Sequence, residues 1–321
     1  MIRNNSVLPR AVVLLWMGFS TLVSAEPENP FQLLTAMQQA MTSLSYEGTV
    51  AILKNGKLDT SNYFHSVQNG AEQERLLSLN SPVREVIRDN DRVSCLFKAT
   101  QEVIVDHKPI RQAFLLNLPT DASKLKPFYD VKTEGNEQIA MQKAILITLT
   151  PKDQYRHTRK VWVADESKLP LKIEVQDFTG TTLEQIQFTD LRVVKELNNV
   201  NVNLDTKNVH HIHQFEDLGL AKLPITIEQI PLGFEKISFT RTQLPSGKQG
   251  VDQLLLSDGL SSVSVYLDKK NQKNHSSLQT AGAVNAYSHA LDDYSITIIG
   301  DVPAVTVEAI AKGIAISKNL N

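Results

Sequence analysis

Strand-like alternation of apolar and polar residues, interrupted by turn signals, runs through most of this chain. From Leu169 to Val175 every odd position is apolar and polar residues fall between them, which predicts a strand with one buried and one wet face. Polar breaks separate this run from apolar residues at 161–163 and from Ile186 and Phe188. The segment 159–188 is therefore predicted to be a three-stranded antiparallel meander. Its apolar face needs either the protein's own core or a guest molecule against it.

Similar runs fill the first two thirds of the chain. Asn-Gly pairs at 55–56 and 69–70 predict tight hairpin turns. Asn29 before Pro30 predicts a helix start, and apolar residues then recur at helical spacing up to Leu44. A short helix is expected between Pro119 and Pro127. Strands are predicted at 46–53, 58–67, 72–79, 83–88, 92–97 and 139–149.

The pattern fails between about residues 198 and 223, where an asparagine-rich stretch is followed by a mixture of His, Asp and Lys. We interpret this as a linker. Beyond it, strands are predicted at 225–230, 234–242, 253–257, 263–268 and 294–299, with a closing helix after Pro303. The predicted organisation is an N-terminal domain at 26–200, a linker at 201–222 and a smaller C-terminal α+β domain at 223–321, which suits a chain of 321 residues.

The first 25 residues have the composition of a secretory signal peptide. Arg3 and Arg10 supply positive charge, residues 11–23 are mostly apolar, and small residues at 23–25 allow cleavage before Glu26. The apolar run is shorter than the roughly 18 residues that a membrane span needs. We therefore predict an exported, soluble protein in the periplasm.

Composition excludes several classes of protein. The formal net charge of −2 gives no reason to expect a nucleic-acid partner. Cys95 is the single cysteine, so no internal disulfide can form and packing must stabilise the fold.

No motif for catalysis stands out. The sequence contains no nucleophile elbow, no zinc-protease motif and no phosphate-binding loop, and the acidic pairs Asp89/Asp91 and Asp292/Asp293 lie in stretches typical of turns. His210, His211 and His213 form a dense cluster, but in a predicted linker they lack the rigid frame of a metal site. We predict no catalytic residue, no cofactor and no metal.

Three stretches together resemble the RseB/MucB family of periplasmic regulators of the envelope-stress factor sigma-E. They are VWVADESKLPLKIEVQDFTGTTLEQIQF at 161–188, IPLGFEKISFTRTQLP at 230–245 and LLLSDGLSSVSVYLDK at 254–269. The Ser257-Asp258-Gly259 motif of the third stretch is the most family-specific part. The first stretch is also similar to the outer-membrane lipoprotein carriers LolA and LolB.

The resemblance implies an α+β fold in which the N-terminal domain is an open antiparallel half-barrel with helices on its concave side. It also implies a non-enzymatic negative regulator that binds the periplasmic part of a transmembrane anti-sigma factor (RseA or MucA) and shields it from the site-1 protease DegS. Lipid-like signals, such as lipopolysaccharide or lipoprotein acyl chains, would release it. The alternative is a periplasmic lipoprotein or lipid carrier, although a simple carrier does not need residues 223–321. Homo-oligomer formation is left open.

If the half-barrel hosts an acyl chain, the apolar side chains of the meander are the candidates to face it. These lipid-facing candidates are Trp162, Ile173, Val175, Ile186 and Phe188. Trp162 is even-numbered and need not share the face of Ile173 and Val175. The alternative is that these residues pack under the predicted N-terminal helix and that no cavity is left.

Overall fold

The computed structural model describes residues 29–80, 84–89, 92–97, 102–107, 114–195, 197, 209–243, 250–269 and 276–317. The predicted signal peptide and residues 198–208 of the linker region lie outside the described residues. None of the helices in the described ranges is long and apolar enough to cross a membrane.

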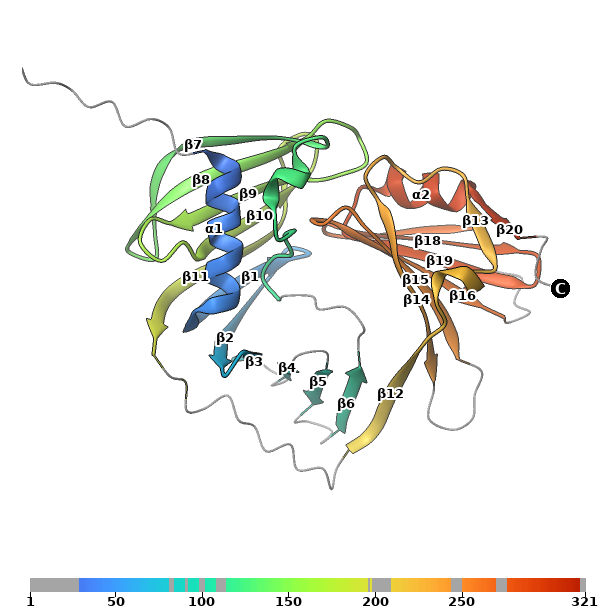
Figure 1. The fold of residues 1–321 in the computed structure, drawn as a ribbon, viewed down its shortest axis with the longest axis horizontal. Helices are drawn as coiled ribbons and strands as arrows, with labels where there is room; N and C mark the ends of the chain where they lie inside the picture. The colour runs from blue at the N-terminus through green and yellow to red at the C-terminus, as the bar shows by residue number, and fades with distance from the viewer. Residues whose placement is uncertain are drawn as a thin grey trace, which may run out of the picture.

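The N-terminal domain is a long, open antiparallel sheet covered on one side by a helix (Figure 1). Its strands follow the spatial order β7-β8-β9-β10-β11-β1-β2-β3-β4-β5-β6, and every neighbouring pair is antiparallel. The elements are α1 (Pro30–Ser43), β1 (Ser45–Lys54), β2 (Lys57–Gln68), β3 (Ala71–Ser78), β4 (Arg84–Asp89), β5 (Arg92–Phe97), β6 (Glu102–His107), η1 (Ala122–Leu125), β7 (Tyr129–Ile139), β8 (Gln142–Pro151), β9 (Thr158–Ala164), β10 (Pro170–Gln176) and β11 (Thr182–Val194).

The C-terminal domain continues the same hydrogen-bonded sheet through β12. This strand pairs in parallel with β6 and, further along, antiparallel with β14, so it links the two domains (Figure 1). The order beyond it is β14-β15-β16-β19-β18-β17. The elements are β12 (Val209–Asp217), η3 (Leu220–Lys222), β13 (Ile225–Ile227), β14 (Glu235–Gln243), β15 (Val251–Ser257), β16 (Ser262–Asp268), β17 (Ser277–Ala281), β18 (Val284–Leu291), β19 (Tyr294–Gly300), α2 (Ala304–Lys312) and β20 (Ile314–Ile316).

Helix α1 begins where the sequence predicts. The Asn29 side chain accepts a hydrogen bond from the Phe31 backbone N–H at 3.0 Å, and Pro30 occupies the first turn, where no N–H is required. The buried stripe of α1 packs into the N-terminal core, which also contains residues of β1, β2 and β7–β11. A separate core lies between α2 and the C-terminal sheet. The α+β class, the open antiparallel sheet and the two-domain architecture are thus confirmed.

The prediction that β10 has a wet face is wrong. Glu174 and Gln176 are buried, as are Ile173 and Val175 on the opposite face. The polar side chains of this face contact one another. The Lys172 ammonium lies 2.6 Å from Glu174, and the Gln176 amide donates to Glu174 at 3.0 Å. Alternation marked the two faces correctly but could not show that both are covered.

Two further expectations are corrected. Ile139–Leu149 is not one strand, because Ala140 and Met141 adopt positive φ angles of 49° and 62° and form the turn between β7 and β8. Residues 209–217 of the predicted linker form β12, because its first part pairs with β6 and its second part with β14, and backbone pairing requires no apolar alternation. Strands β6, β7, β17, β18 and β20 were not predicted from the sequence.

Candidate functional site

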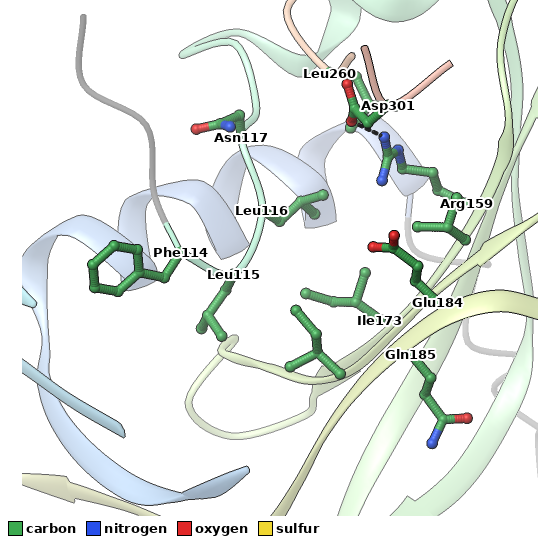
Figure 2. A pocket seen from close by; sticks show the side chains of 12 residues that line it. Phe114, Leu115, Leu116, Asn117, Arg159, Ile173, Glu184, Gln185, Leu260 and Asp301 are labelled. Carbon is green, nitrogen blue, oxygen red and sulfur yellow. Dashed lines mark hydrogen bonds and ion pairs between the residues drawn. The ribbon is translucent and has the colours of Figure 1, made fainter. Parts of the chain in front are cut away.

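A pocket of about 200 Å³ lies where the two domains meet (Figure 2). Strands β9, β10 and β11 supply one wall, residues 114–117 supply another, and Leu260 and Asp301 of the C-terminal domain complete it. Figure 2 shows the apolar side chains Leu115, Leu116 and Ile173 together with the polar side chains Asn117, Glu184 and Gln185, with the Arg159–Asp301 pair at one side. The pocket therefore combines apolar and polar lining residues with a charged pair contributed by both domains.

Only part of the predicted lipid-facing set lines this pocket. Ile173, Val175 and Ile186 do so. Trp162 lies on the opposite face, where the Lys172 ammonium is 4.2 Å from its ring centroid, and Phe188 packs edge-to-face on Tyr63 inside the core. Trp162 is on the other face because it pairs with Lys172 rather than with Ile173, and successive residues of a strand point to opposite faces.

Arg159 and Asp301 join β9 to the C-terminal domain beside the pocket. Arg159 Nη2 lies 2.5 Å from Asp301 Oδ2 and 3.3 Å from the Ser261 hydroxyl. The second oxygen of Asp301 accepts from the Ser262 backbone N–H at 2.8 Å. Arg159 has the same parity as the buried Val161 and Val163, so a charge at a position that alternation predicts to be buried was the sequence signal for this contact.

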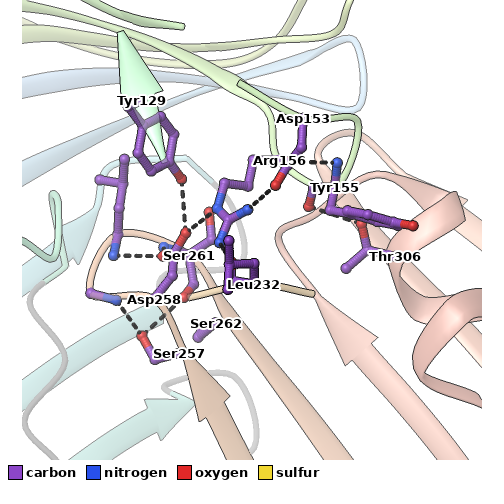
Figure 3. A network of polar contacts seen from close by, with 12 residues as sticks. Tyr129, Asp153, Tyr155, Arg156, Leu232, Ser257, Asp258, Ser261, Ser262 and Thr306 are labelled. Carbon is purple, nitrogen blue, oxygen red and sulfur yellow. Dashed lines mark hydrogen bonds and ion pairs between the residues drawn. The ribbon is translucent and has the colours of Figure 1, made fainter. Parts of the chain in front are cut away.

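The Ser257-Asp258-Gly259 motif forms the centre of a larger polar network between the domains (Figure 3). Asp258 Oδ1 accepts from the backbone N–H groups of Leu260 and Ser261, which fixes the turn. Its Oδ2 accepts from the Tyr129 hydroxyl at 3.0 Å and from Arg156 Nε at 2.6 Å. Both the Arg156 and the Asp258 side chains are fully buried, so this is an ion pair shielded from water.

Arg156 also contacts aromatic rings, a second carboxylate and a backbone carbonyl. Its guanidinium lies between the rings of Phe128 and Phe234, with 5.1 Å and 4.8 Å to the ring centroids. It also pairs with Asp153 and donates to the Leu232 carbonyl at 2.5 Å. Because its partners come from both domains, Arg156 fixes their relative position.

The turn after Asp258 also contributes an apolar contact. Leu260 is only 4% exposed and belongs to the core of the N-terminal domain. Gly259, at φ 92°, lies against Pro119, whose ring is 3.5 Å from the position that a β-carbon would take. A glycine is needed here because this φ favours it.

Two titratable groups in this interface have shifted pKa values. Burial, reinforced by the nearby Asp258 carboxylate, raises the pKa of the Tyr129 hydroxyl, which therefore stays a hydrogen-bond donor. Burial lowers the pKa of His157, whose Nε2 donates to the Ala283 carbonyl at 3.1 Å. His157 Nδ1 is buried without a hydrogen-bond partner in the described part of the chain, as suits a neutral ring.

A second buried ionic cluster, which was not predicted from the sequence, lies inside the N-terminal sheet. Arg88 on β4 bonds Glu72 at 2.9 Å and Glu74 at 2.8 Å, both on β3. His65 Nε2 lies 3.0 Å from Glu72, and the Tyr63 hydroxyl donates to Glu74 at 2.8 Å. His65, Glu72 and Glu74 are close enough to share a metal ion, but both carboxylates already bond Arg88. The residues 210–213, considered above for metal binding, fall on β12, and the side chains of His210, His211 and His213 are outside the described part.

Comparison with known proteins identifies the family. The family model described as MucB/RseB N-terminal domain matches residues 29–206, and the MucB/RseB C-terminal domain matches residues 221–315. The chain belongs to the MucB/RseB family. Its MucB/RseB relatives include the sigma-E factor regulatory protein RseB of Salmonella typhimurium, 28% identical over 92% of this chain and 93% of that protein. Another is the sigma factor AlgU regulatory protein MucB of Pseudomonas aeruginosa, 26% identical over 88% of this chain and 89% of that protein.

A solved structure confirms the MucB/RseB fold. The crystal structure of MucB in complex with MucA(peri) matches with a TM-score of 0.71 and 24% identity, covering 90% of this chain and 99% of that chain. The similarity therefore extends over both domains and the connection between them.

Proposed function

We propose that this protein is a periplasmic negative regulator of a sigma-E-type envelope stress response. It binds the periplasmic part of a transmembrane anti-sigma factor of the RseA/MucA type and shields it from the site-1 protease. The observation that carries the proposal is the similarity of both domains to MucB, which has been solved in complex with MucA(peri). Shielding needs a binding surface and no catalytic group, so the protein acts without chemistry of its own.

Binding and protection can be tested together. The mature protein is mixed with the periplasmic segment of the host's own anti-sigma factor, and complex formation is measured by calorimetry. Site-1 cleavage of that segment is then followed with and without the protein. We expect a complex at micromolar concentration or below and slower cleavage in its presence. If no complex forms in this range, the proposed function is wrong.

Export is part of the proposal, and it rests on the sequence of the first 25 residues. Mass spectrometry of the protein recovered from the periplasmic fraction should give a chain that begins at Glu26. A full-length chain retained in the membrane fraction would contradict this.

The signal that relieves shielding is proposed to be an acyl chain in the pocket between the domains. Ile173, Val175 and Ile186 provide apolar lining from the N-terminal domain, and Leu260 provides it from the C-terminal domain. Burial of each methylene contributes about 0.8 kcal/mol. Because the walls come from both domains, a ligand there distinguishes between arrangements of the domains, which is the condition for a ligand to shift a conformational equilibrium.

Amphiphiles with one head group and increasing acyl length test this proposal. We expect longer chains to release the anti-sigma segment at lower concentration. Val175→Leu, which adds a methylene to the pocket wall, should weaken this dependence, while the same substitution at the exposed Val193 of β11 should not. Release that is independent of chain length would rule out the acyl signal. Acyl binding by a protein that does not bind the anti-sigma segment would instead favour a lipid carrier.

A further inference from the structure

Eighteen of the described strands form one hydrogen-bonded series that ends in two edges, and β13 and β20 form a separate pair. Within the described ranges, β7 pairs with β8 alone at one end, and β17 pairs with β18 alone at the other. An unpaired edge offers free backbone N–H and C=O groups to another extended chain, and natural proteins usually protect such edges with charges, bulges or proline. The two edges of this protein differ in this respect.

Edge strand β7 is protected. It carries four charged residues in its eleven positions and has a bulge between Thr133 and Gly135, where Gly135 has φ 123°. Both features disfavour the addition of a further strand. The charged residues are Asp130, Lys132, Glu134 and Glu137.

Edge strand β17 has none of these features. Its sequence, Ser-Leu-Gln-Thr-Ala, contains no charge and no proline, and its register with β18 runs without a bulge. All five residues are exposed, and Leu278 is 44% exposed. The strand therefore presents a regular, uncharged edge with an apolar side chain near its centre.

The register shows which groups face outward. Gly282 and Ala283 form a two-residue turn, and Ala281 opposite Val284 is the pair that closes the hairpin. In such hairpins the closing pair is hydrogen-bonded and the next pair is not, so the pairs alternate. The N–H and C=O groups of Leu278 and Thr280 therefore point away from β18, toward the free side.

Contacts across the domain boundary fix this edge in place. The turn at the end of β17 packs on the N-terminal domain, where the Ala283 N–H donates to Glu184 at 3.3 Å and the Ala283 carbonyl accepts from His157 at 3.1 Å. A strand added to β17 would thus continue the surface on which the domains meet. A preformed, anchored edge reduces the entropy lost when an extended chain binds.

We propose that β17 is the docking edge for an extended, uncharged segment of the anti-sigma factor's periplasmic domain, which adds to the sheet as a further strand. This inference rests on the proposed function. The partner's backbone would bond the outward N–H and C=O groups of Leu278 and Thr280, and an apolar partner side chain would lie against Leu278. We assign the edge to the anti-sigma factor rather than to a second copy of this protein. A flexible segment can follow the twist of β17, whereas a second copy would have to offer either β17 itself or the charged β7.

Proline substitution provides a direct test, because it removes a backbone donor and is tolerated on edge strands. Leu278→Pro removes an outward N–H from β17, and Leu278→Thr changes the side chain but keeps the N–H. Gln138→Pro is the matched control, since Gln138 precedes the pair Ile139–Gln142 that closes the β7–β8 turn and so faces outward on the other edge. We expect Leu278→Pro to weaken binding of the anti-sigma segment at least tenfold, Leu278→Thr to weaken it less, and Gln138→Pro to leave it unchanged.

Hydrogen exchange in the unsubstituted protein gives an answer that does not depend on folding of a variant. The amides of Leu278 and Thr280 should exchange rapidly in the free protein and become protected in the complex, while the amide of Gln138 should not change. Two results would overturn the proposal that β17 is the docking edge and leave the proposed function intact. One is a complex that forms without protecting these amides, and the other is normal affinity in a folded Leu278→Pro variant. Protection that rises with protein concentration alone assigns the edge to a second copy and also overturns the proposal. Failure of the unsubstituted protein to bind overturns the proposed function itself.

Discussion

Two buried ionic clusters in the described part of the chain contain similar groups but join residues at very different separations in the sequence. In the cluster inside the N-terminal sheet, Arg88 binds Glu72 and Glu74, which are 16 and 14 residues away on a neighbouring strand. In the cluster between the domains, Arg156 binds Asp258, which is 102 residues away. The first cluster stabilises one domain, whereas the second holds two domains together. The same chemistry is therefore expected to have different consequences when it is removed.

The largest effect is expected from Arg88→Met. It leaves Glu72 and Glu74 buried without their main counter-charge, which typically costs about 3–5 kcal/mol of the free energy of unfolding. Thermal and urea unfolding should show the N-terminal domain destabilised by this amount. Arg192→Met, which breaks an exposed pair with Glu47, is the control and should cost less than about 1 kcal/mol. Adding Glu72→Gln and Glu74→Gln to Arg88→Met should recover part of the loss, and no recovery would show that lost packing dominates.

A smaller effect, of another kind, is expected from Asp258→Asn. An asparagine can still accept from the Leu260 and Ser261 N–H groups, but its amide replaces a charged acceptor opposite Arg156, which costs about 1.5–3 kcal/mol. Because this contact joins the domains, calorimetry should show two separate unfolding transitions and small-angle scattering should show a more extended protein. The same substitution at the partly exposed Asp177 is the control. A single transition, shifted downward with unchanged dimensions, would mean that the cluster stabilises a domain rather than the interface.

Asp301→Asn should cost less than Asp258→Asn. Asp301 pairs with Arg159, but its side chain is 33% exposed, so water screens the pair and the expected loss is about 1 kcal/mol. A double-mutant cycle with Arg159→Met would measure the coupling energy between the two side chains. A coupling larger than that between Arg156 and Asp258 would reverse the proposed order of the two contacts.

The smallest effect is a pH dependence from His157. Burial lowers its pKa below the ordinary value of 6.5, so below pH 6.5 the unfolded chain binds a proton that the folded protein resists. The free energy of unfolding should therefore fall as pH decreases below 6.5, with a slope from this residue of at most about 1.4 kcal/mol per pH unit. His157→Gln should reduce the slope between pH 6.5 and 5.5, as measured by urea unfolding. His289→Gln removes another histidine with a pKa lowered by burial, but one away from the interdomain contacts, and should leave domain separation unchanged. An unaltered slope in His157→Gln would show that His157 does not contribute.

The division into domains at 26–200 and 223–321 remains a prediction that proteolysis can refine. The asparagine-rich stretch 198–208 lacks apolar spacing, so we expect the first cleavage there. Initial cleavage within 161–190 would contradict the assignment.

Local sequence alone determined much of the secondary structure. The Asn29 cap, the Asn-Gly turns at 55–56 and 69–70, whose residues all have positive φ, and the meander around β10 occur as predicted. The short helix η1 lies between Pro119 and Pro127, and helix α2 follows Pro303. These features depend on backbone conformation and side-chain alternation within a few residues, which is the information that a sequence pattern contains.

Only the tertiary structure decided which faces are covered and which charges are buried. The parallel pairing of β12 with β6, the seating of Leu260 in the core of the other domain and the burial of Arg156 against Asp258 all join residues that are distant in the chain. A charged residue at an inward position, such as Arg159 or Glu74, can signal that a partner is needed but not which one. The partner is determined by which strands pair and by where the two domains meet, and no local periodicity records either.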